Sequence, residues 1–145
     1  MIFVKKMFSW TIRAFIFKDT LCTACFLFVM CSYLTASDVF GRFTGMKKVE
    51  VLDLAHNQIK ALSDGTFRHL PNLKELYLNH NNLRHLPKHV FHGLAKLETL
   101  TMQSNLLNKW MLQMNIFPNL KYLRLDGNRI RKIRKNDFIG MSSLL

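Results

Sequence analysis

The sequence has no cysteine after Cys31, and this absence limits how the larger part of the chain can be held together. All three cysteines, Cys22, Cys25 and Cys31, lie in an apolar N-terminal stretch. Residues 38–145 therefore contain no disulfide framework, and cysteine usage does not report their redox compartment. Cys22-x-x-Cys25 has the spacing of a redox or zinc pair, but it has no second pair. We interpret it as part of a membrane or signal segment.

Motifs that carry catalysis are also missing. There is no Gly-x-Ser-x-Gly and no His-Glu-x-x-His, and only six glycines are present in the whole chain, which leaves little for a phosphate-binding loop. No Asn-x-Ser/Thr sequence occurs, so no N-glycan is expected. We therefore expect no enzyme activity and no cofactor.

Acidic residues are scarce. The chain has 9 acidic and 21 basic residues, a formal charge of +12. Residues 1–37 contribute +3, and residues 38–145 contribute +9 from 17 basic and 8 acidic side chains. A surface that basic favours acidic partners such as sulfated glycans, anionic lipid, acidic proteins or nucleic acid.

An uncharged apolar run of 18 residues, Thr20–Ser37, comes after four basic residues near the N-terminus. Positive charge before such a run directs the downstream chain across the membrane. The small residues Thr35, Ala36 and Ser37 would suit cleavage of a signal peptide. The run is also close to the ~20 residues that span a bilayer, so an uncleaved signal anchor stays open, as does a buried helix of the domain. Both targeting interpretations predict that residues 38–145 are secreted or extracellular at the plasma membrane.

Four segments after residue 48 share one template, Leu-x-x-Leu-x-Leu-x-x-Asn-x-Leu, with other apolar residues at some leucine positions. They start at Val49, Leu73, Leu97 and Leu120, 23 or 24 residues apart. Further apolar positions recur six and three residues before each start. The first set is Phe43, Phe67, Phe91, Met114 and Phe138, and the second is Met46, Leu70, Leu94, Phe117 and Met141. So many positions in register indicate a structural repeat.

This pattern resembles the leucine-rich repeat family over residues 43–145, in the 24-residue form common in extracellular and receptor proteins. The resemblance implies an α/β-type solenoid, a right-handed coil with short parallel strands on its concave face, here preceded by an apolar N-terminal helix. Leucines two apart point to one face of a strand, and one coil cannot bury that face alone, so coils must stack. We predict strands near 51–54, 75–78, 99–102 and 122–125. We also predict a ladder of asparagine side chains that satisfy backbone groups, formed by Asn57, Asn81, Asn105 and Asn128.

The predicted organisation has three parts. Residues 1–37 form the signal peptide or signal-anchor helix, residues 38–48 a partial entry coil, and residues 49–145 the repeats. The repeats span 49–72, 73–96, 97–119 and 120–143, and a fifth starts at Leu144. Because the stack is incomplete at both ends, we expect a fragment or short isoform of a longer receptor-like protein.

Outward residues of the strands form the candidate ligand-binding surface. Tyr77, Tyr122 and Arg124 are the best anchors, because aromatic and arginine side chains often dominate interface energies. The full candidate set on the concave face is Asp53, His56, Tyr77, His80, Thr101, Tyr122 and Arg124. His56 and His80 occupy one column of adjacent coils, ~4.8 Å apart, but the column offers no third ligand, so we predict no metal site.

The densest positive charge comes after the fourth strand, at Arg129, Arg131, Lys132, Arg134 and Lys135. It is either a solvated rim, which we favour, or a polyanion patch. The leading hypothesis is an extracellular or membrane-anchored module for protein–protein interaction with a receptor-like or adhesion-like role. The alternative is binding of a sulfated glycan or anionic lipid through the basic loop face. We expect an unidentified protein ligand, the membrane through the N-terminal segment and an acidic glycan as partners, and no nucleic acid.

Overall fold

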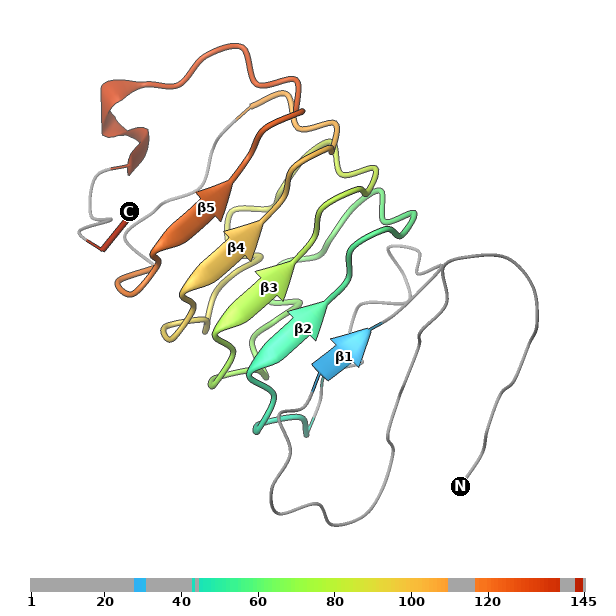
Figure 1. The fold of residues 1–145 in the computed structure, drawn as a ribbon, viewed down its shortest axis with the longest axis vertical. Coiled ribbons are helices and arrows are strands. Elements are labelled where there is room, and N and C mark those ends of the chain that lie inside the picture. The colour runs from blue at the N-terminus through green and yellow to red at the C-terminus, as the bar shows by residue number, and fades with distance from the viewer. Residues whose placement is uncertain (1–27, 31–42, 44, 110–116, 139–142, 145) are drawn as a thin grey trace.

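The protein folds as a stack of coils with one strand in each coil (Figure 1). The structure is a computed structural model that describes residues 28–30, 43, 45–109, 117–138 and 143–144. Its five-stranded sheet is parallel and follows chain order. The strands are β1 (Phe28–Met30), β2 (Val51–Asp53), β3 (Glu75–Tyr77), β4 (Thr99–Thr101) and β5 (Tyr122–Arg124). The four strands predicted from the repeat are confirmed, each one residue shorter than expected.

The first strand, β1, differs from the sequence-based expectation. Phe28–Met30 lies inside the apolar run that we predicted to be a helix, and it pairs in parallel with β2. Aromatic and branched apolar residues suit a strand as well as a helix, and residues 24–31 include no polar side chain whose spacing could separate the two. The rest of that run, with the expected signal segment, lies outside the described residues. No helix in the described ranges is long and apolar enough to cross a membrane.

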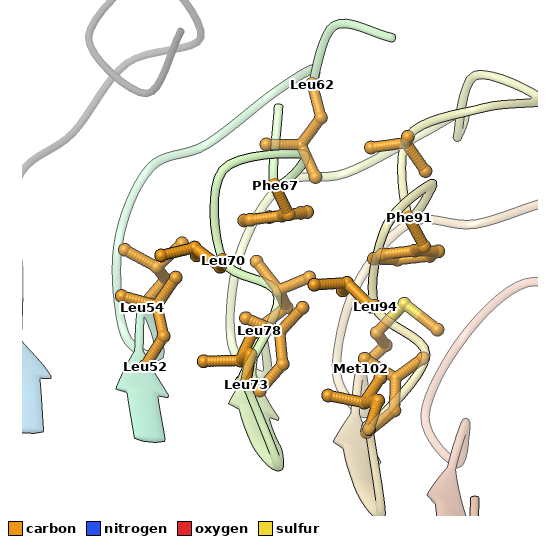
Figure 2. Packing of buried hydrophobic residues seen from close by; sticks show 14 of the residues in the cluster. Leu52, Leu54, Leu62, Phe67, Leu70, Leu73, Leu78, Phe91, Leu94 and Met102 are labelled. Atoms are coloured by element: carbon orange, nitrogen blue, oxygen red, sulfur yellow. The ribbon is translucent and has the colours of Figure 1, made fainter. Parts of the chain in front are cut away.

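Leucines at equivalent positions of neighbouring coils build the core (Figure 2). Leu52, Leu76, Leu100 and Leu123 are direct partners in the strand register, and the first three are fully buried. Turns form most of the described part of each coil's outer half, and the helix found there is the 3-10 helix η2 (Lys135–Phe138). The core is therefore a column of leucines that no single coil could bury alone.

Phenylalanine rings form a second column in the outer half of the coils. Phe43, Phe67 and Phe91 stack with centroids 6.0 and 5.9 Å apart. Phe117 continues the column, with its ring 5.6 Å from that of Phe91. The repeat alignment had assigned this place to Met114, which lies outside the described residues. Phe117, three residues after Met114, therefore supplies the ring that extends the aromatic column.

The asparagine ladder has the predicted geometry. The side-chain amide of Asn81 donates to the carbonyl of Leu54 in the preceding coil (2.8 Å) and to that of Leu78 in its own coil (3.1 Å). Its Oδ1 accepts from the amide of Ile59 at 3.0 Å. Asn105 and Asn128 repeat this arrangement one and two coils later. Each of these side-chain amides therefore joins two coils, and a carbonyl such as that of Leu78 accepts from the asparagines of two successive coils.

Loss of this link should destabilise the stack. We expect Asn81→Ala to lower the free energy of unfolding by about 1–3 kcal/mol, because the buried amide of Ile59 loses its acceptor and the carbonyls of Leu54 and Leu78 each lose one of two donors. Asn82→Ala is the matched control. Asn82 is exposed and only its backbone amide bonds to the preceding coil, so its cost should be about 0.5 kcal/mol or less. Urea denaturation measures both, and equal midpoints would contradict the ladder's role.

Candidate binding surface

The strand register sorts the outward side chains of β2 to β5 into two columns, which we call the strand face. One column holds Asp53, Tyr77, Thr101 and Arg124, and the other holds Val51, Glu75, Thr99 and Tyr122. Four candidate ligand-binding residues therefore share one column, and Tyr122 lies in the other. Period-two alternation produces this arrangement, because the leucine between the two outward residues of each strand points into the core.

Exposure is uneven across the strand face. Thr101 is buried, with 7% of its surface exposed, and its hydroxyl donates to Oδ1 of Asn79 at 2.9 Å. Tyr122 is 54% exposed, and Arg124 beside it on β5 is also exposed and lies 3.4 Å from the carboxylate of Asp126. The most accessible aromatic and arginine side chains of the strand face therefore both lie on β5.

Tyr77 is held in place by a carboxylate on its own strand. Its hydroxyl donates a hydrogen bond to Glu75. This hydrogen bond, partial burial and the negative charges of Glu75 and Asp53 raise the pKa of Tyr77 to about 12, since all of them favour the protonated phenol. Tyr77 is thus a fixed hydrogen-bonded ring on the strand face.

A ladder of alternating charge flanks the strands where they begin. Lys74 lies 2.9 Å from Glu50, and Lys121 lies 2.7 Å from Glu98. The hydrogen bond and charge of Glu50 raise the pKa of Lys74, and those of Lys121 lower the pKa of Glu98. The sequence analysis did not identify these ion pairs. The sequence signal for these pairs is a charge that changes sign from one repeat to the next at the same repeat position, as at Glu50, Lys74, Glu98 and Lys121.

His56, His80, Ser104 and Gly127 form a third column, just after the strands. All four have a left-handed backbone, with φ of 56°, 54°, 54° and 68°. Each of the first three donates its amide proton to the neighbouring coil, as His80 does to Gln103. The rings of His56 and His80 stack with centroids 4.3 Å apart and planes 14° apart. In the described part of the chain, no group of three or more His, Cys, Asp or Glu side chains could hold a metal ion.

The residues after this column form a basic edge, which we call the rim. It comprises residues 57–62, 81–86, 105–109 and 128–134, and the sequence has no acidic residue in these ranges. Its exposed cations are Lys60, Arg84, Lys109, Arg129, Arg131, Lys132 and Arg134. The fifth residue of the predicted cluster, Lys135, begins η2. The predicted cluster is therefore the densest part of a basic edge that spans all four repeats.

Comparisons with known proteins agree with this geometry. A family model described as "Leucine rich repeat" matches residues 47–107, and one described as "Leucine Rich Repeat" matches residues 119–141. Together they cover more than half of the chain. A search of curated proteins finds no match.

Two solved structures have a similar fold. One is the TLR13–ssRNA13 complex, with 32% identity and a TM-score of 0.67 over 80% of this chain. The other is the Drosophila melanogaster SNF/U2A' complex, with 18% identity and a TM-score of 0.59 over 76% of this chain. The chain spans 17% of the first protein's length and 63% of the second's. We expected no nucleic acid among the partners. This expectation is wrong, because the similar TLR13 structure is a complex with RNA.

The environment of Tyr77 can be tested by titration. In a Tyr33→Phe, Tyr122→Phe background, tyrosinate absorbance should report a pKa of about 12, against about 10 for a free tyrosine. Glu75→Ala should lower this pKa, because the acceptor and its charge are removed. Since the folded pKa is raised, the associated stability is present below pH ~10 and is lost between about 10 and 12. An unchanged pKa in Glu75→Ala would contradict the assigned cause.

Proposed function

This chain belongs to the leucine-rich repeat family, and we propose that it is an extracellular or membrane-anchored module that binds a protein partner through its strand face. Leucine-rich repeats typically serve as interaction modules without catalysis. One observation carries the proposal: Tyr122 and Arg124 lie together on β5 with their side chains exposed. Tyrosine and arginine are over-represented among the residues that dominate binding energies.

The rest of the strand face supports these anchors by being fixed in place. Tyr77 is held by Glu75, and Thr101 by Asn79. The paired charges beside the strands further restrict the side chains. A surface whose side chains are already ordered loses less conformational entropy when a partner binds.

A panel of displayed extracellular proteins, probed with the full chain, would test this proposal. Any ligand found is then measured against Tyr122→Ala and Arg124→Ala, which should each weaken binding by about tenfold or more if they are anchors. Lys88→Ala is the control, because Lys88 is exposed in the outer half of a coil. Unchanged affinity in both strand-face variants would contradict the proposal.

The extracellular location rests on the N-terminal segment. The uncharged run Thr20–Ser37 with basic residues before it is typical of segments that enter the secretory pathway. The likeness to TLR13 at 32% identity is consistent with a receptor-like role. The segment contains β1, so cleavage as a signal peptide would leave a sheet that begins at β2, and insertion as a membrane anchor would compete with the pairing of β1 and β2.

A reporter fusion tests this location. Residues 1–37 fused to a cytosolic reporter should carry it into the membrane or secreted fraction. Replacing Leu21 and Phe28 by arginine should return the reporter to the cytosol, since charge in the apolar run opposes membrane insertion. A wild-type fusion that stays wholly soluble in the cytosol would refute the targeting proposal.

A second candidate function is polyanion binding at the rim. The observation that favours it is that every repeat contributes exposed cations to the rim, whose four ranges contain no acidic residue. Sulfated glycan, anionic lipid and nucleic acid all offer the negative charge that such an edge attracts. Binding there would leave the strand face free for a protein.

A further inference from the structure

The column of left-handed residues contains two rings and then two small residues. His80 stacks on His56 on one side, and the next positions of the column are Ser104 and Gly127. A Cβ atom added to Gly127 would lie 3.2 Å from Oγ of Ser104, so these two residues pack directly against each other. His80, Ser104 and Gly127 are all exposed. We call the ring of His80, together with the small residues Ser104 and Gly127 that follow it in the column, the shelf.

The shelf has the shape and chemistry to accept another planar ring. The 4.3 Å separation of His56 and His80 shows that rings one coil apart can stack in this column. At Ser104 and Gly127 the protein supplies no ring of its own. A flat aromatic group seated over these residues would extend the stack from His80, and stacking on aromatic side chains is how proteins bind unpaired bases without sequence preference.

Positive charge lies next to the shelf. Arg129 lies two residues after Gly127, and its backbone amide bonds to the carbonyl of Leu107 in the third coil at 2.9 Å. Arg129 and Arg131 are exposed. The nearby acidic residue Asp126 has its own partner, Arg124, at 3.4 Å. A ligand chain that extends from the shelf along the fourth coil would therefore reach these rim cations.

From this juxtaposition we propose that the shelf and the adjoining rim bind single-stranded nucleic acid. A base stacks on His80 over Ser104 and Gly127, while neighbouring phosphates contact Arg129 and Arg131. Sulfated glycans and lipid headgroups supply the negative charge but no planar aromatic ring, so the shelf favours a nucleotide chain. The inference deepens the second candidate function and is independent of protein binding at the strand face.

The test uses the full chain with a fluorescent uridylate 20-mer, a thymidylate 20-mer and inorganic polyphosphate. His80→Asn removes the ring and retains a residue type that tolerates the left-handed backbone. It should weaken binding of both 20-mers about fivefold or more and leave polyphosphate binding unchanged. His56→Asn is the matched control, because it leaves the ring of His80 and the floor of the shelf in place.

The charge contribution is measured separately. Arg129→Gln with Arg131→Gln should weaken all three probes and reduce the slope of log affinity against log salt by about 1.4, at ~0.7 for each phosphate contact of a single strand. Lys47→Gln with Lys48→Gln removes the same charge outside the rim and should have little effect. Thermal melts check that each variant is folded.

Two results would overturn the inference. One is a His80→Asn variant that is folded and binds the 20-mers as tightly as the wild type. The other is equal affinity for heparin oligosaccharide or phosphatidylserine vesicles at matched charge, which would leave general polyanion binding intact without a nucleotide site.

Discussion

The buried side-chain amide of the repeat asparagine is the interaction on which the rest of the structure depends. Where the chain leaves each strand, backbone groups of two coils point into an apolar interior without a ladder partner. One asparagine, such as Asn81 or Asn105, satisfies groups of both coils at once. Because an unpaired buried polar group is costly, this requirement fixes how far one coil is displaced from the next. With the coils in this register, leucines at equivalent positions of neighbouring coils pack against each other and form the core.

The same register organises the surface. Once coils are stacked in phase, every outward position becomes a column, and the residues in a column interact although 23 or 24 positions separate them in sequence. Charges that alternate along a column form ion pairs, as Lys74 does with Glu50. Rings in a column stack, as His56 and His80 do. Surface chemistry in such a protein is therefore organised one column at a time, with a coil as the unit of spacing.

Prediction from the sequence succeeded where the repeat itself supplies the restraint. The strands β2 to β5 and the asparagine ladder result from fixed apolar and amide positions that recur in phase. It failed at β1, because the run around Phe28–Met30 has no polar positions to reveal a period. It also missed the aromatic role of Phe117 and the ion pairs beside the strands. These contacts depend on which side chain occupies a column in two adjacent coils, which a template for a single repeat does not record.

The distribution of charge separates the two candidate surfaces by mechanism. On the strand side, Glu50 and Glu98 are neutralised by lysines of the next coil, so the net positive charge of residues 38–145 is concentrated away from the strand face. The rim has no such compensation within its own ranges. Attraction to the rim is therefore a long-range effect that weakens as salt shortens the Debye length, ~8 Å at physiological ionic strength. The proposed recognition at Tyr122 and Arg124 would depend instead on close contact, which salt affects far less. The two proposed surfaces therefore respond to different physical variables, so raising the salt concentration would weaken binding at the rim while leaving binding at Tyr122 and Arg124 largely unchanged.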